Sequence, residues 1–159
     1  MLNRWKEDID SFISLADKHG VKMLMVGGGA VNFHGYQRHS ADVDFWLDTS
    51  DLNLDKLLKV FNEMGCSINS FPEKVRHQEQ NISVKFSPSD LNLELITRFS
   101  ISKSFDEAYM NSVIAEVNDR NVFKWNVLSL EDLIDSKIRS GRNKDILDVQ
   151  ELKRIHNLE

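Results

Sequence analysis

The segment from residue 22 to residue 47 constrains the fold of this chain more than any other part of the sequence. It begins with the apolar run KMLMV, passes through three consecutive glycines at 27 to 29, and ends with the alternating run ADVDFWL. A short apolar run that stops at glycine predicts a buried strand, and alternation predicts a strand with one buried face. A short helix at 28 to 35, closed by Gly35, would connect the two strands.

Further helices and strands are predicted on both sides of this segment. Apolar residues at helical spacing predict helices at 3 to 19, where Trp5, Ile9, Phe12, Ile13 and Ala16 share a face, and at 52 to 64, with a helical turn at 104 to 110. The other predicted strands are at 81 to 86, 91 to 97, 113 to 117 and 121 to 127. The turn at 87 to 90 indicates that the first two of these form a hairpin.

The last part of the chain predicts two helices. Ser129 can cap a helix that runs to about Ser140, and Gly141 breaks it. Asn143 can cap the final helix. The apolar residues predicted on the buried face of that helix are Ile146, Val149, Leu152 and Ile155. The order of all these elements predicts an α/β (α+β) fold, with a mixed β-sheet flanked by helices and C-terminal helices at its end.

Length, charge and cysteine content narrow the class of protein. The chain has 159 residues, of which 41% are hydrophobic, so we expect a single domain over 1–159 with a real core. A net charge of −5 argues against electrostatic binding of nucleic acid over a broad surface of the protein. Cys66 is the only cysteine, so no disulfide can form within the chain. No apolar run approaches the roughly 20 residues that span a bilayer, and the first residues lack a signal peptide's apolar core. We therefore expect a cytoplasmic protein without membrane contact.

The glycines do not fit the common nucleotide motifs. A dinucleotide loop requires G-x-G-x-x-G, but Asn32 occupies the third glycine position. A P-loop requires Gly-Lys after four residues, whereas Gly35 is followed by Tyr36. What is left is a strand, a glycine turn and a helix. Such a turn either allows close packing or lets the backbone approach a phosphate group, and both interpretations stay open.

Two aspartates on the alternating strand indicate a metal site. Because side chains alternate along a strand, Asp42 and Asp44 share one face, while Val43 and Phe45 share the other. Two carboxylates this close repel each other unless solvent or a cation separates them. Mg²⁺ prefers oxygen ligands and often takes one or two carboxylates together with substrate phosphates. A second D-x-D, Asp8 to Asp10, falls inside a predicted helix and indicates only solvated charge.

Glu94 is a candidate third acid. It stands between two leucines on the predicted strand at 91 to 97. If this strand neighbours the strand of Asp42 and Asp44, Glu94 can join them, and three carboxylates on adjacent strands suit two-metal phosphoryl transfer. The alternative is an edge-strand carboxylate that faces water.

The segment GGGAVNFHGYQRHSADVDFWL resembles the signature of the DNA polymerase β-like nucleotidyltransferase superfamily. The resemblance is to its small bacterial branch, of the abortive-infection and toxin–antitoxin type, with G-G-x-A, a short helix, R-x-[ST]-x-D-x-D and a later acid on a strand. The C-terminal part resembles the same branch, with a lysine in one helix and then R-x-K-D-x-x-D. The residues at the matching positions are Gly27, Gly28, Ala30, Arg38, Ser40, Asp42, Asp44, Glu94, Lys137, Arg142, Lys144, Asp145 and Asp148. The resemblance spans roughly residues 21 to 155.

This resemblance implies an enzyme that transfers a nucleoside monophosphate from a nucleoside triphosphate to a hydroxyl acceptor and releases pyrophosphate. It implies Mg²⁺ or Mn²⁺ at Asp42, Asp44 and Glu94, which would also be the catalytic residues. Triphosphate contacts are implied for Gly27, Gly28, Arg38, Ser40, Lys137 and Lys144. The acceptor is RNA, a protein or a small molecule, and a protein partner or a homodimer that completes the acceptor site is a further expectation.

The sequence also supports other interpretations. Many members of the superfamily have Ser or Thr where this chain has Gly29, which favours a weakly catalytic binding or regulatory module, such as a toxin–antitoxin component. An antibiotic-modifying nucleotidyltransferase would share the same chemistry. Arg38 and Lys137 are either phosphate ligands or surface charges, and Asp145 and Asp148 have a simple explanation in the first turns of a helix. Trp46 either stacks on a base or packs beneath a helix.

Overall fold

The sheet confirms the predicted α/β (α+β) class. The computed structural model describes residues 7–40, 42–86, 91–118 and 122–158. In this part of the chain, a six-stranded mixed sheet has the strand order β3-β4-β2-β1-β6-β5. The strands are β1 Met23–Val26, β2 Asp42–Leu47, β3 Ile82–Val84, β4 Asn92–Ile96, β5 Val113–Asn118 and β6 Val122–Val127.

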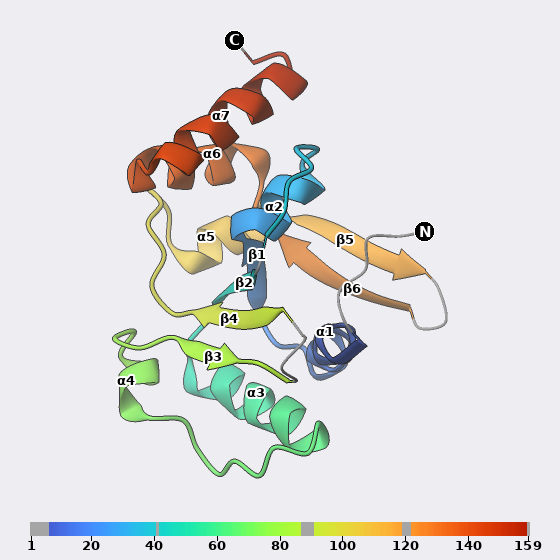
Figure 1. Cartoon of the computed structure of the whole chain (residues 1–159). Helices are drawn as coiled ribbons and strands as arrows, with labels where there is room; N and C mark the ends of the chain where they lie inside the picture. The colour runs from blue at the N-terminus through green and yellow to red at the C-terminus, as the bar shows by residue number, and fades with distance from the viewer. Residues whose placement is uncertain (1–6, 41, 87–90, 119–121, 159) are drawn as a thin grey trace.

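Helices cover both faces of this sheet. They are α1 Glu7–His19, α2 Gly27–Phe33, α3 Asp51–Glu63, α4 Glu73–Arg76, α5 Phe105–Met110, α6 Leu130–Ser140 and α7 Asn143–Ile155. Figure 1 shows α1 and α3 on one side of the sheet, and α2, α6 and α7 on the other. None of these helices is long and apolar enough to cross a membrane, as judged over the described ranges.

The main core lies between the sheet and the helices α1 and α3. Alternation along β2 directs Val43 and Phe45 into this core, where each is at most 1% exposed. The rings of Phe12 in α1 and Phe61 in α3 pack against each other with centroids 5.5 Å apart. The predicted apolar face of the first helix is confirmed for Ile9, Phe12, Ile13 and Ala16, which are fully buried. Residues 3 to 6 of that predicted helix lie outside the described residues.

The opposite face of the sheet has an aromatic cluster next to the carboxylates. Trp46 is 7% exposed. Its ring lies 5.3 Å from that of Phe99 and 5.1 Å from that of Phe105, which is the first residue of α5. These contacts support the interpretation in which Trp46 packs beneath a helix.

Strand pairing brings the predicted acidic residues into neighbouring positions. β2 pairs in parallel with β4, so Asp42 lies opposite Asn92 and Asp44 lies opposite Glu94. β3 pairs with β4 in the antiparallel direction that a hairpin requires, and Ser83 lies opposite Glu94. The predicted turn at 87 to 90 lies outside the described residues. The condition that the strand of Glu94 neighbours the D-x-D strand is therefore met.

The last helix differs from its prediction in two ways. The predicted cap at Asn143 is wrong, because Arg142 is the N-cap residue and Asn143 is the first residue inside α7. Ile146, predicted to be buried, is 50% exposed, whereas the helix buries Asp145 and Asp148. The buried face is displaced because α7 directs two carboxylates, rather than only aliphatic side chains, toward the rest of the protein.

Replacement of Phe45 by alanine tests the importance of the central strand for stability. Removing a fully buried aromatic side chain leaves a cavity, so Phe45→Ala should lower the free energy of unfolding by about 3–5 kcal/mol. Leu52→Ala is the matched control, because Leu52 in α3 is 67% exposed and its loss should cost less than about 0.5 kcal/mol. Urea unfolding followed by circular dichroism measures both values, and equal effects would contradict this account of the core.

Candidate active site

The turn at Gly27 lies directly against Asp44. β1 and β2 are antiparallel, and their register places Val26 opposite Asp44, so the chain turns into α2 beside this carboxylate. Gly27 has a φ of 63°, a left-handed conformation that favours glycine. A Cβ atom at this position would lie 2.5 Å from Oδ2 of Asp44. The glycine is therefore required both by the backbone and by the space that Asp44 occupies.

The next glycine allows the loop after α2 to fold back onto the turn. A Cβ atom at Gly28 would lie 2.5 Å from Oγ of Ser40 and 3.6 Å from Nη1 of Arg38. The Ser40 hydroxyl donates a hydrogen bond of 2.9 Å to the backbone carbonyl of Asp42. Ser40 therefore ties this loop to the beginning of β2, and Gly28 provides the room for it.

A small cavity brings together the glycine turn, two aspartates and two cations. It has a volume of about 110 Å³, and its lining includes Gly27, Asp44, Lys137, Arg142 and Asp145. Lys137 belongs to α6, and Arg142 precedes α7. Residues from three separate parts of the sequence thus meet at one point on the carboxylate face of the sheet.

Lys137 is part of a buried network of ion pairs. Its Nζ lies 3.1 Å from Oδ1 of Asp145 and 3.0 Å from Oδ2 of Asp148. Arg38 binds Asp148 with two hydrogen bonds, from Nε at 2.8 Å and from Nη2 at 3.0 Å. Arg142 donates from Nε to Oδ2 of Asp145 at 2.7 Å. Asp145 and Asp148 are at most 1% exposed, so both negative charges are compensated inside the protein.

This network shows a role for Asp145 and Asp148 that their position in the first turns of a helix does not explain. Burial acts to raise the pKa of Asp145, but the hydrogen bonds from Arg142 and Lys137 outweigh it and lower the pKa to about 2. The available sequence signal was the spacing of Asp145, Asp148 and Leu152 on one helical face, where Leu152 is fully buried.

Asp44 is in the opposite electrostatic situation. Burial, together with the negative charges of Asp42 and Glu94, raises its pKa to about 6, although Lys137 and Lys144 act in the other direction. Lys144 is exposed, whereas Lys137 is 6% exposed. Asp44 therefore retains a negative charge at neutral pH in a place where that charge is unfavourable without a further cation.

The other two acidic residues have polar partners on the same face. Oδ1 of Asp42 accepts a hydrogen bond of 3.1 Å from Nδ2 of Asn92. The Glu94 carboxylate accepts from the hydroxyl of Ser83, with oxygen–oxygen distances of 2.6 and 2.8 Å. Across the residues that the structure describes, no three His, Cys, Asp or Glu side chains are grouped so that they could hold a metal ion. Asp42, Asp44 and Glu94 therefore lie at neighbouring positions of the paired strands without forming such a group. Glu94 is instead hydrogen-bonded to Ser83.

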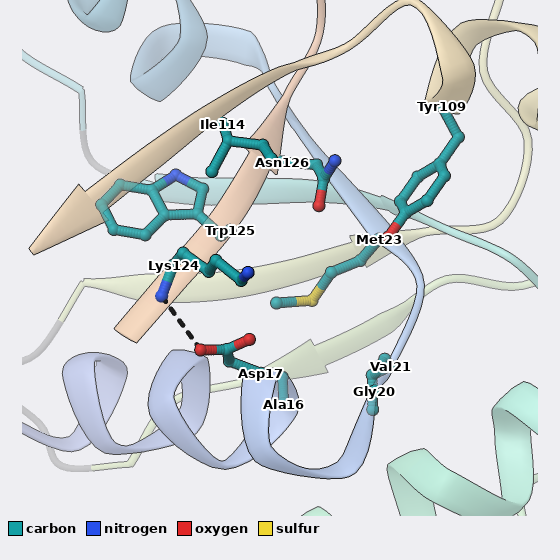
Figure 2. Close-up of a pocket in the computed structure, with 10 residues that line it drawn as sticks. All are labelled: Ala16, Asp17, Gly20, Val21, Met23, Tyr109, Ile114, Lys124, Trp125 and Asn126. Atoms are coloured by element: carbon teal, nitrogen blue, oxygen red, sulfur yellow. Dashed lines mark hydrogen bonds between the residues drawn. The ribbon is translucent and has the colours of Figure 1, made fainter. Parts of the chain in front are cut away.

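A second cavity lies at the opposite end of β1. Figure 2 shows it between the end of α1 and the strand β6, with Tyr109 and Trp125 on opposite sides. Its volume is about 250 Å³, and Met23, the first residue of β1, contributes to its lining. The backbone amide of Lys124 donates to Asp17 at 3.1 Å within it. None of the residues predicted for catalysis or phosphate binding lines this second cavity.

Replacement of Asp148 tests the ion network. Asp148→Asn removes a buried charge that compensates Arg38 and Lys137, so we expect a loss of about 3–5 kcal/mol of unfolding free energy. Glu73→Gln is the control, because Glu73 pairs with Arg76 on the surface of α4, where its side chain is 72% exposed, and should contribute less than about 1 kcal/mol. Urea unfolding measures both variants, and a loss for Asp148→Asn as small as that of the control would contradict the network's role.

Asp44→Asn should stabilise the metal-free protein. The raised pKa means that the folded state binds this proton more tightly than the unfolded state, so stability falls as pH rises from about 4 to about 6 and then stays level. Asparagine removes this dependence and should add up to about 3 kcal/mol at pH 7. Unfolding with a metal chelator, at about pH 4 and about pH 7, provides the measurement. If the variant is less stable than the wild type at the higher pH, the ionised Asp44 carboxylate does not destabilise the folded protein, and this account is contradicted.

Comparison with known proteins identifies the family of this chain. Residues 2–159 match the family described as nucleotidyltransferase of unknown function (DUF6036). Comparison with curated proteins gives no match. The family match covers almost the whole chain and confirms the resemblance to nucleotidyltransferases that residues 27 to 47 first indicated. The chain therefore belongs to this nucleotidyltransferase family.

Proposed function

We propose that this chain transfers a nucleoside monophosphate from a nucleoside triphosphate to a hydroxyl group and releases pyrophosphate. The observation that supports this function most is the cavity in which Gly27, Asp44, Lys137 and Arg142 meet. A carboxylate for a metal ion, a turn without side chains and the exposed cation Arg142 are groups that suit a metal–triphosphate complex, while Lys137 holds the surrounding helices in place. Family membership supports the same reaction class.

The acidic residues suit a divalent cation by their chemistry. Mg²⁺ takes oxygen ligands and is commonly bound by one or two carboxylates with substrate phosphates, and Asp42 and Asp44 are two half-buried carboxylates on one face of β2. Burial, together with the charges of Asp42 and Glu94, raises the pKa of Asp44, so a bound cation would stabilise its ionised form. Asp42 and Asp44 would therefore hold Mg²⁺ or Mn²⁺, with Glu94 as the neighbouring third acid. When bound, the ion would neutralise charge on the triphosphate and favour departure of pyrophosphate.

The cations divide into two groups by the exposure of their side chains. Arg38 and Lys137 are largely buried and bound to buried aspartates, so we assign them to holding the loop and the helices in position beside Asp44. Arg142 also binds the buried Asp145, but its side chain is 60% exposed, and Lys144 is exposed as well. In the proposed reaction, these two would contact the triphosphate. Glu94 would accept the proton of the acceptor hydroxyl. The acceptor can be RNA, a protein or a small molecule.

One observation favours a second function, that of a weakly catalytic binding or regulatory module such as a toxin–antitoxin component. Lys137, which the resemblance assigns to the triphosphate, already has two carboxylate partners within 3.1 Å. A module of this kind would bind a protein partner and bind nucleotide weakly. Calorimetry with ATP and Mg²⁺ separates the two functions, because binding accompanied by pyrophosphate release supports the enzyme and excludes the module.

Asp44→Asn tests the proposed enzyme. Labelled nucleoside triphosphates, Mg²⁺ and candidate RNA, protein and small-molecule acceptors should give transfer by the wild type. The variant should be at least about 100-fold slower, because loss of a metal ligand removes several kcal/mol of transition-state stabilisation. Asp8→Asn, in the second D-x-D on α1, is the matched control and should keep full activity. Equal rates for Asp44→Asn and the wild type would contradict the assignment.

A further inference from the structure

The exposed serine Ser83 is bound to the acid that the proposed reaction uses as its base. The Ser83 hydroxyl lies 2.6 Å from Oε1 and 2.8 Å from Oε2 of Glu94, so both carboxylate oxygens face this hydroxyl. A hydroxyl within about 2.6–3.2 Å of a carboxylate is the arrangement of a nucleophile and its general base. Ser83 therefore already occupies the position, relative to Glu94, that an acceptor hydroxyl must reach.

Strand register places this pair beside the proposed metal site. Ser83 lies opposite Glu94, and Glu94 lies opposite Asp44 on the next strand. Directly opposed residues point to the same face of a sheet, so the three side chains form one row across β3, β4 and β2. Two strand spacings, about 10 Å in total, separate the backbones of Ser83 and Asp44. The side chains stand on the same face of the sheet, where a bound triphosphate can bridge this separation.

Ser83 is also accessible. It is exposed, and β3 is at the edge of the sheet, so no further strand covers it within the part of the chain that the structure describes. The hydroxyl can thus meet a nucleotide without any rearrangement of the core.

We propose that Ser83 is itself a nucleotidyl acceptor, so that the chain modifies its own edge strand. This inference rests on the proposed function. Oγ of Ser83 attacks the α-phosphorus of a nucleoside triphosphate and forms a new O–P bond, while Glu94 takes the hydroxyl proton. The bond between the α-phosphorus and the oxygen that bridges to the β-phosphate breaks, and pyrophosphate leaves with its electron pair. The product is a phosphodiester between Ser83 and a nucleoside.

The modification should limit itself to one nucleotide per chain. The new phosphodiester carries a negative charge next to Asp42, Asp44 and Glu94, and it removes the hydroxyl that Glu94 binds. Both changes oppose a second triphosphate at this site.

Intact-protein mass spectrometry tests the proposal directly. The whole chain is incubated with Mg²⁺ and each of ATP, GTP, CTP and UTP, and the mass should increase by one nucleoside monophosphate with at least one of them. Peptide mapping should place the added group on Ser83. Ser83→Ala should lose the modification, Ser83→Thr should keep it because the hydroxyl is retained, and Ser100→Ala, at another exposed serine, should not change it.

The negative outcomes are distinguishable. If the wild type transfers nucleotide to an added acceptor but Ser83 stays unmodified, the inference is wrong and the proposed function stands. If no transfer occurs, the proposed function fails and the inference fails with it, even where a nucleotide raises the melting temperature. Modification on another residue, with Ser83 unchanged, also overturns the inference.

Discussion

The buried ion pairs beneath α7 are the interaction on which the arrangement of the site depends. Asp145 and Asp148 have almost no exposed surface, and an uncompensated charge in such a place would cost several kcal/mol. Their cationic partners come from the loop after α2, from α6 and from the residue before α7. Satisfying these charges fixes the last two helices against the glycine turn. As a result, the cations stand beside Asp44.

The site therefore combines one compensated and one uncompensated set of carboxylates. Asp145 has a pKa of about 2, because the hydrogen bonds from two cations exceed the effect of burial, whereas Asp44 has a pKa of about 6 because burial and two nearby acids disfavour its charge. The pKa values of two aspartates that line the same cavity thus differ widely. The first set holds the structure together, and we propose that the second binds a cationic ligand. In the proposed function, bound Mg²⁺ would offset the charge of this second set.

Local patterns in the sequence predicted the elements that place the acids. The alternation in ADVDFWL was sufficient to put Asp42 and Asp44 on one face, and the apolar neighbours of Glu94 predicted its strand. The parallel pairing of β2 with β4 is a long-range contact. From the sequence alone, the approach of Glu94 to the two aspartates could therefore be predicted only on the condition that their strands are neighbours. The bond from Arg38 to Asp148 joins residues 110 positions apart, which no local pattern reveals. The exposed position of Ile146 follows from the same network, because α7 turns its aspartates inward.

The most direct test of this account is a crystal structure of the chain with Mg²⁺ and a non-hydrolysable nucleoside triphosphate. The account predicts phosphates in the cavity between Gly27 and Arg142, with the metal ion bound by Asp42 and Asp44. A nucleotide in the other cavity, between Tyr109 and Trp125 at the far end of β1, would contradict it (Figure 2).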